Sequence, residues 1–200
     1  FISGLRLVLK SKPALYGLVL GLVFVGGNEV INLVFGVWLQ DSFNLQITGL
    51  GLTAMLLGAA ELGGEGLGAL LIDRLGKERS VAVGLALCVL DALALPVLGA
   101  SQAGALVWLF LFYLAFEFAI IAAISLMSEV LPAARATLLA TFIAAVSLGR
   151  AGGDLIAPHA YALGFGANVA LSAGLNLIGL LVLSRIRVAP AASVLPETAE

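Results

Sequence analysis

The segment 69–80, ALLIDRLGKERS, constrains the fold most, because it places a charged turn between two long apolar runs. A turn this rich in charge cannot lie in hydrocarbon, and each flanking run is about as long as a bilayer is thick. The segment therefore marks one face of a membrane. Five charged side chains surround Gly76: Asp73, Arg74, Lys77, Glu78 and Arg79.

Composition indicates an integral membrane protein. The 200 residues are 62% hydrophobic and 11% charged, whereas soluble domains are about 25% charged and about half apolar or less. The net charge is -2 and the cations are spread among turns, which argues against a nucleic-acid partner. The single cysteine, Cys88, lies within an apolar run, so an intrachain disulfide is excluded.

Six membrane-spanning helices are predicted, and together they define the domain organisation. Each is near the roughly 20 residues that a helix needs to cross a bilayer, and is too long and continuous for a barrel strand. We expect residues 1–13 to form a cytoplasmic linker or short interfacial helix, 14–187 the bundle, and 188–200 a disordered cytoplasmic tail. The predicted spans are 14–38, 48–72, 80–99, 104–128, 136–158 and 165–184.

The cations predict the topology. Nine of the ten Lys and Arg residues lie at the start of the chain, in the second and fourth turns, or after the last span. The positive-inside rule places these segments, and both ends, in the cytoplasm. The chain begins at Phe1 without a signal-peptide pattern, so we expect the C-terminal part of a longer polypeptide. The Ala, Gly and Leu bias favours a bacterial source, hence the inner membrane.

Five ionisable residues fall near mid-depth, one on each of the first five spans, although each costs about 2.5–3.5 kcal/mol at a helix centre. We expect them to face one another or a hydrated cavity. Glu65 lies nearer the cytoplasm and Asp154 nearer the outside. The five mid-depth residues are Glu29, Glu61, Asp91, Glu117 and Arg150.

Glu29 is flanked by Asn28 and Asn32, and we interpret this polar patch as a substrate or proton site. A hydrogen-bonded contact between helices is the alternative. The pair Gly26–Gly27, directly before the patch, permits a kink beside it. The other glycines at small-xxx-small spacing are interpreted as helix-packing positions.

Two carboxylates, Glu61 and Glu65, are four residues apart and so share one helical face. Their repulsion favours a proton on one of them, although hydration near the cytoplasmic end is an alternative for Glu65. Glu117 lies within the aromatic run FLFYLAFEF, a setting that suits a lipophilic ligand, including a cationic one. Alternatively, those rings face lipid or neighbouring helices.

Arg150 is the one cation at mid-depth, and two pairings stay open for it. One is a local pair with Asp154, one turn later. The other is a pair across the bundle with Glu29, Glu117 or Asp91, which protonation would break.

Catalytic and metal-binding patterns are absent from the sequence. It contains no G-x-S-x-G, H-E-x-x-H, CxxC or Walker motif, and the single histidine, His159, excludes a histidine metal cluster. We therefore predict no enzyme, no catalytic residue, no cofactor and no metal. Protonatable acids without a nucleophile favour transport.

The turn ALLIDRLGKER resembles the signature G-x-x-x-D-R-x-G-R/K-x-R of the major facilitator superfamily. Ala69 departs from its first position, with Gly68 one place earlier. The region LPAARATLLATFIAAVSLGRAGGDLIAPHAYALGFGAN is also similar to the tenth-to-eleventh turn and eleventh helix of bacterial drug- or sugar-efflux members. The matching signature residues are Asp73, Arg74, Gly76, Lys77 and Arg79.

This resemblance implies helices seven to twelve of a twelve-helix transporter, built as two inverted three-helix repeats. It implies an N-terminal six-helix half in the same chain, and a cavity lined by the seventh and tenth helices. Glu29, Asn28, Asn32 and Glu117 would then be cavity groups, with Asp91 structural. Asp73 and Arg74 would latch helices at a cytoplasmic gate.

Together these features predict a secondary transporter in the lipid bilayer that exports a small molecule in exchange for protons. Protonation of Glu29 or Glu117 first, and of Glu61 next, would switch its ion pairing. A membrane subunit that only assembles partners through its polar residues is the alternative.

Overall fold

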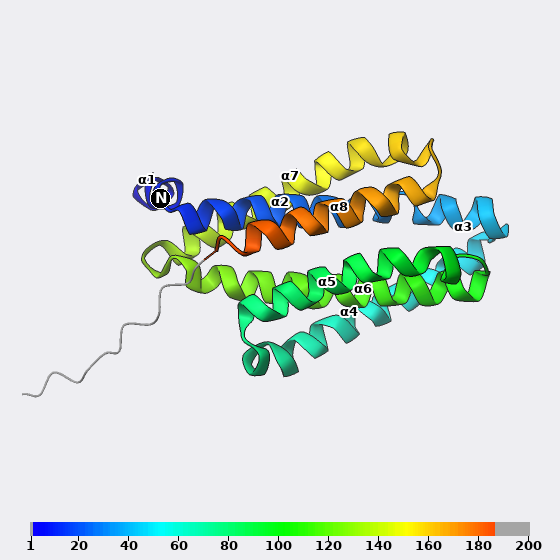
Figure 1. Cartoon of the computed structure of the whole chain (residues 1–200), viewed down its shortest axis with the longest axis horizontal. Coiled ribbons are helices and arrows are strands. Elements are labelled where there is room, and N and C mark those ends of the chain that lie inside the picture. Colours follow the sequence, from blue (N-terminus) through cyan, green and yellow to red (C-terminus); the bar gives the residue numbers. More distant parts are fainter. Residues whose placement is uncertain (1, 187–200) are drawn as a thin grey trace, which may run out of the picture.

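The computed structural model describes residues 2–186, and these form an all-helical bundle (Figure 1). Six helical segments are long and apolar enough to cross a membrane, which confirms the predicted fold class. The predicted tail, 188–200, lies outside the described residues. The helices are α1 (Ile2–Lys10), α2 (Lys12–Asn32), α3 (Phe35–Phe43), α4 (Ile47–Leu75), α5 (Lys77–Leu98), α6 (Gln102–Val130), the short 3₁₀ helix η1 (Pro132–Ala134), α7 (Arg135–Tyr161) and α8 (Phe165–Leu183).

The first span differs from the single helix predicted over 14–38, because it is broken between α2 and α3 at Leu33 and Val34. The N–H of Val34 donates to the carbonyl of Ile31 at 3.1 Å, one residue short of the α-helical pattern. The helix runs unbroken through Gly26–Gly27, the pair that would permit a kink. Those glycines instead serve close packing against neighbouring helices.

The expected linker at the start of the chain contains a helix, α1. Val8 is fully buried, and Gly4 packs against the side chain of Thr137 on α7. Ser11 then caps α2 by accepting a hydrogen bond from the N–H of Ala14. The segment before the first span is therefore attached to the bundle.

The two predicted three-helix repeats interleave. The first comprises α2 with α3, α4 and α5, and the second comprises α6, α7 and α8. The first helix of each group packs mainly on the last two helices of the other: α2 on α7 and α8, and α6 on α4 and α5. Contacts between α5 and α8 and between α2 and α6 join the two sets. This exchange is the arrangement expected of two inverted repeats.

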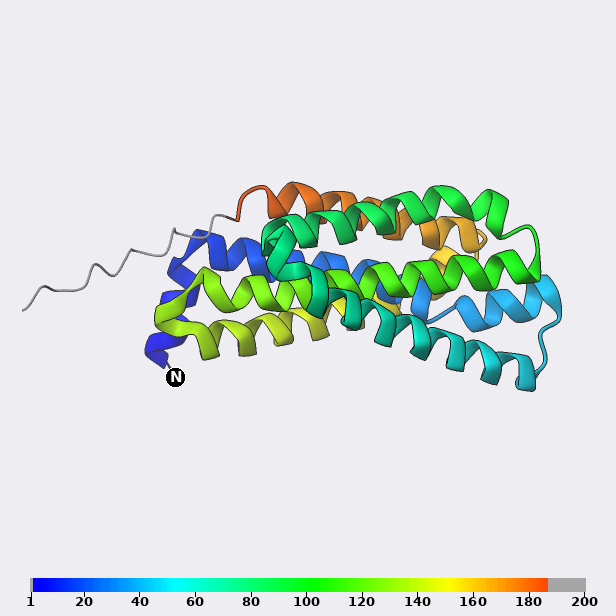
Figure 2. The ribbon, with the colours of Figure 1, turned by 90° about the horizontal axis from the view of Figure 1, so that it is seen from below.

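The connections between the helices lie at the two ends of the bundle (Figures 1 and 2). The N-terminus, the α4–α5 turn, η1 and the last turn of α8 lie at one end, here called the basic end because Arg74, Lys77 and Arg135 are there (Figures 1 and 2). The far end holds the α3–α4, α5–α6 and α7–α8 connections (Figures 1 and 2). The helices of both three-helix repeats thus run between the same two ends of the bundle (Figures 1 and 2).

Two apolar cores fill the bundle, one toward each end. Phe24 and Phe116 belong to the core toward the basic end, with ring centroids 5.0 Å apart. Trp38, Trp108 and Phe165 belong to the core toward the far end, where Trp38 and Phe165 stack at 4.0 Å. Asn28 and Glu29 of α2 lie in sequence between Val25, which belongs to the first core, and Ile31, which belongs to the second.

Candidate functional site

A polar network joins α2, α6 and α7 at mid-depth. The carboxylate of Glu29 accepts a hydrogen bond from Asn32 Nδ2 at 2.6 Å and pairs with Arg150 Nη1 at 3.6 Å. The hydroxyl of Tyr113 on α6 donates to Asn32 Oδ1. Glu29 is 6% exposed, and its Oε2 has no hydrogen bond, so that oxygen depends on the ion pair alone.

This network answers the question that the sequence left open about Arg150. The pair runs across the bundle to Glu29, and no Arg150–Asp154 ion pair occurs among residues 2–186. The carboxylate of Glu29 is buried whereas the Arg150 side chain is half exposed. The cation therefore keeps contact with the surroundings of the bundle while it neutralises a buried acid.

Glycines bring α7 close enough to α2 for this pairing. A Cβ on Gly153 would lie 2.7 Å from the carbonyl oxygen of Gly26 and 2.8 Å from Glu29 Cβ, and one on Gly149 would overlap the carbonyl of Leu22. Real Cβ atoms do not approach this closely. Small-xxx-small spacing thus gives backbone-to-backbone contact directly beside Glu29.

A second acidic group lies between α4 and α6. Glu117 on α6 is within electrostatic range of Glu61 and Glu65 on α4, and of Arg150. A Cβ on Gly64 would lie 2.6 Å from the carbonyl oxygen of Leu114 and 2.7 Å from Glu117 Cβ. The acids predicted on separate spans are therefore brought together here.

The two groups are related by the interleaved repeats. Gly153 packs on the Cβ of Glu29 and on the carbonyl three residues before it, and Gly64 packs in the same way on Glu117. Each glutamate thus lies on the first helix of its repeat, against a glycine on the second helix of the other repeat. The sequence did not show this equivalence, because it requires the packing of both helix pairs.

Equivalent positions carry opposite charge. Arg150 lies three residues before Gly153, and Glu61 lies three residues before Gly64. One residue after the glycines, both sides are acidic, with Asp154 and Glu65. The α2–α7 side therefore balances acid with a cation, whereas the α4–α6 side gathers three carboxyls, and Arg150 is a cation within electrostatic range of one of them, Glu117.

Other predicted groups lie apart from this network. Asn28 is 4% exposed and its Oδ1 has no partner among residues 2–186. Asp91 is buried on α5, where its backbone carbonyl accepts a hydrogen bond from Trp108 Nε1 at 2.8 Å. The helix that carries it, α5, packs on α6 and α8, and the structural role that the resemblance implied for Asp91 stays a prediction.

The aromatic residues around Glu117 pack within the protein. Phe112, Phe116 and Phe118 are buried, with Phe112 stacked on Trp108 at 5.7 Å between ring centroids. These rings therefore follow the alternative interpretation, contact with neighbouring helices. Tyr113 is the member of the run that reaches the polar network, and sequence reasoning did not select it.

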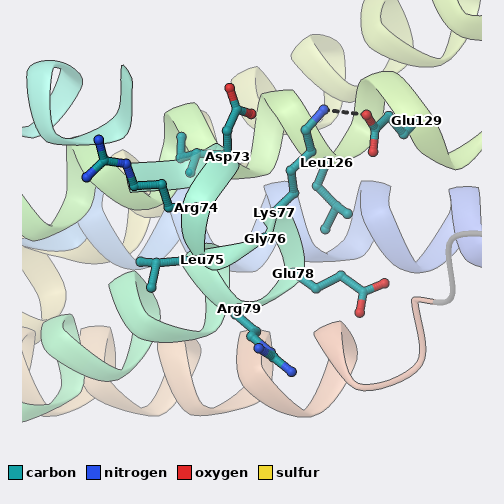
Figure 3. Close-up of a pocket in the computed structure, with 10 residues that line it drawn as sticks. Asp73, Arg74, Leu75, Gly76, Lys77, Glu78, Arg79, Leu126 and Glu129 are labelled. Atoms are coloured by element: carbon teal, nitrogen blue, oxygen red, sulfur yellow. Dashed lines mark hydrogen bonds and ion pairs between the residues drawn. The ribbon is translucent and has the colours of Figure 1, made fainter. Parts of the chain in front are cut away.

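The charged turn between α4 and α5 forms the second feature of interest (Figure 3). Gly76 has φ +86°, a value that side chains rarely adopt, so it reverses the chain in a single residue. Lys77 Nζ contacts Glu129 Oε1 on α6 at 2.5 Å, as Figure 3 shows. Segment 72–79 together with Leu126 and Glu129 borders a cavity of about 550 Å³.

These observations define a class: a multi-pass helical membrane protein with ionisable groups gathered near the middle of its helices and a charged turn at one end of the bundle. The family model described as Major Facilitator Superfamily matches residues 1–158, and the chain belongs to that superfamily of membrane transporters. Neither a curated protein nor a solved structure matches the chain.

Proposed function

We propose that this transporter exports a small molecule in exchange for protons, by alternating access. The observation that carries the proposal is the gathering of Glu29, Glu61, Glu117 and Arg150 from four helices at mid-depth. Charged groups in a membrane interior are costly and belong to ion and substrate pathways. With Asn28 and Asn32 they are the proposed substrate and coupling residues.

The ion pair supplies a mechanism for coupling. A proton on Glu29 removes the charge that attracts Arg150, so the contact between α2 and α7 weakens. A free Arg150 can then be attracted to the α4–α6 side, where Glu117 already lies within its electrostatic range. Protonation thus changes which helices attract each other, and this biases the equilibrium between two arrangements of the bundle.

The three carboxyls on the α4–α6 side support proton binding there. Like charges held together in a membrane interior favour sharing of a proton, and Glu117 is within electrostatic range of two acids of α4, Glu61 and Glu65. Glu117 and Glu29 occupy equivalent positions in the two repeats. We assign the coupling proton to these two residues first and to Glu61 next.

A second six-helix half of the same chain would cover the surface of α4 and α7 that carries Glu61, Glu65 and Arg150. Glu65 and Arg150 are exposed and Glu61 is half exposed on α4 and α7. Their contact with lipid would cost several kcal/mol, so a protein surface or a hydrated cavity must lie against them. By the positive-inside rule, the basic end faces the cytoplasm of a bacterial inner membrane.

The α4–α5 turn is the proposed gating element at that face. Asp73, Arg74 and Arg79 are exposed, and Lys77 joins the turn to the end of α6 through Glu129. A movement of α6 relative to α4 would stretch this ion pair. Gly76 allows the two helices to meet without a longer loop.

The test is substrate-driven proton efflux from inside-out membrane vesicles that contain the full-length protein. Respiration acidifies the lumen, a pH-sensitive dye reports it, and lipophilic compounds are added one at a time. A compound that dissipates the gradient through the wild-type protein should fail with E29Q and E117Q. The matched control E78Q alters an exposed acid that is outside the network, is not one of the proposed gating residues and makes no ion pair among residues 2–186, so it should retain the response.

An assembly subunit is the competing function, and the exposed charges of α4 and α7 also fit a surface that binds partners. It predicts that E29Q and E117Q release a partner in native gels while no compound drives proton efflux through the wild type. Full proton-coupled transport by E117Q would instead remove Glu117 from the coupling role.

A further inference from the structure

The break between α2 and α3 leaves a carbonyl without its helical donor. In an uninterrupted helix the N–H of Val34 would donate to Val30, but here it donates to Ile31 at 3.1 Å. Val30 is fully buried at this depth. A carbonyl in a membrane interior must find another donor, because water is absent there.

Asn168 on α8 supplies that donor. Its Nδ2 donates to the carbonyl of Val30 at 2.9 Å and, at 2.9 Å, to the carbonyl of Ala157 on α7. Asn168 is completely buried. One side-chain amide therefore binds the last turn of α2, the far half of α7 and the first turn of α8 together.

The bond is made close to the polar network. Val30 follows Glu29 directly and lies two residues before Asn32, which donates to the Glu29 carboxylate. The N–H of Leu33, on the other side of the turn, donates to the carbonyl of Glu29 at 3.0 Å. The hydrogen bond from Asn168 fixes the last turn of α2, and it therefore also helps to hold Glu29 and Asn32 in place.

The helices α2 and α6 occupy equivalent places in the two repeats, and only the first is followed by a break. Its counterpart α6 is one helix from Gln102 to Val130. The repeat architecture therefore does not require a break at this place. Beyond the break, α3 has its own contacts near the far end: Trp38 stacks on Phe165, and Asp41 accepts a hydrogen bond from Tyr161 at 2.8 Å.

We propose that Asn168 is a positioning residue, which holds the end of α2 at the break so that α3 can move about Leu33 and Val34 while Glu29 and Asn32 keep their places. This deepens the proposed function, on which its role in transport rests. The amide stays bonded on the α2 side, and movement is confined to α3 and its contacts with α7 and α8. Asn168 touches neither proton nor substrate.

Hydrogen–deuterium exchange of the full-length protein tests this without any substrate. N168L removes both donated bonds and should speed exchange of the Leu33 and Val34 amides at least tenfold, with little change in α5. N176L is the matched control, because Asn176 lies on the same buried face of α8 but donates to Ser172 on its own helix at 2.9 Å. It should leave exchange at the break unchanged.

A near-isosteric variant protects the test against loss of folding. N168D keeps the shape and, when protonated, donates one bond instead of two, so exchange at the break should lie between wild type and N168L. Wild-type exchange at Leu33 and Val34 in N168L or N168D would overturn the proposal. A uniform increase over all helices would also overturn it, because Asn168 would then support only the fold.

The proton-efflux assay separates this inference from the proposed function. If exchange responds as expected and a compound drives efflux, N168L should lower that efflux at least tenfold while N176L retains it. Retained efflux in N168L would overturn the role in transport. If no compound drives proton efflux through the wild-type protein, the proposed function fails. Faster amide exchange of N168L confined to Leu33 and Val34 would still establish that Asn168 holds the end of α2 at the break.

Discussion

The contact of Gly153 with α2 gives the sharpest prediction. A Cβ in G153A would lie 2.7 Å from the carbonyl oxygen of Gly26 and 2.8 Å from Glu29 Cβ. Ordinary contact begins at 3.4 Å, so the helices must separate by about 0.7 Å. Both neighbours belong to the helix framework and cannot swing aside. Overpacking of this kind costs about 1–3 kcal/mol.

The control is the neighbouring glycine. A Cβ on Gly152 would meet nothing within 4 Å, and G152A gains the same intrinsic helix propensity as G153A. The difference between the two variants therefore isolates the contact with α2. For a folding unit of about 150–250 residues, the expected cost lowers the unfolding midpoint of G153A by about 2–12 °C relative to G152A.

Cys88 provides the assay. It is the only cysteine of the 200 residues and is buried, so a thiol-reactive fluorescent dye labels it as the bundle unfolds. The midpoints of wild type, G152A and G153A are compared in the same detergent. Equal midpoints for G152A and G153A would refute the backbone contact, and with it the geometry that brings Arg150 to Glu29.

The equivalent contact and the charged turn yield three further predictions. G64A should lower the same midpoint by a similar amount, since its Cβ would lie 2.6 Å from a backbone oxygen, whereas G66A, with nothing within 4 Å, should not; equal midpoints would contradict the equivalence of the repeats. G76A should cost about 1–3 kcal/mol because φ +86° is strained for alanine, and an unchanged midpoint would refute the turn geometry. K77E and E129K should each weaken the half-exposed pair by about 1 kcal/mol or less at low salt, and the double exchange should restore it; a double variant no better than either single one would refute the pairing.

Much of the fold follows from the sequence because membrane helices are specified by length and polarity alone. The six spans, the charged turn at Gly76 and the family were all available from apolar runs and one motif. The break at Leu33 was not, because neither residue at the break is a glycine or a proline. Gly26–Gly27, which looked like the weak point, is instead the surface that α7 and α8 approach.

The acids of the candidate site were found from their cost in a membrane, but their partners were not. The sequence left four acids as possible partners for Arg150. The packing of α7 on α2 is what brings Arg150 to Glu29. Tyr113 and Asn168 gave no signal, since a tyrosine in an aromatic run and an asparagine near a helix start are both common. Their roles depend on which neighbour lies opposite, and helical periodicity does not contain that information.

The glycine contact also has a mechanical consequence. The backbone of α7 meets the backbone of α2 at two points one helical turn apart, because a Cβ on Gly149 would overlap the carbonyl oxygen of Leu22 and one on Gly153 would lie 2.7 Å from that of Gly26. Arg150 lies between these two glycines in sequence, so a tilt of α7 about either contact is opposed by the other. The 3.6 Å ion pair between Arg150 and Glu29 is therefore placed where the two helices are least free to move apart.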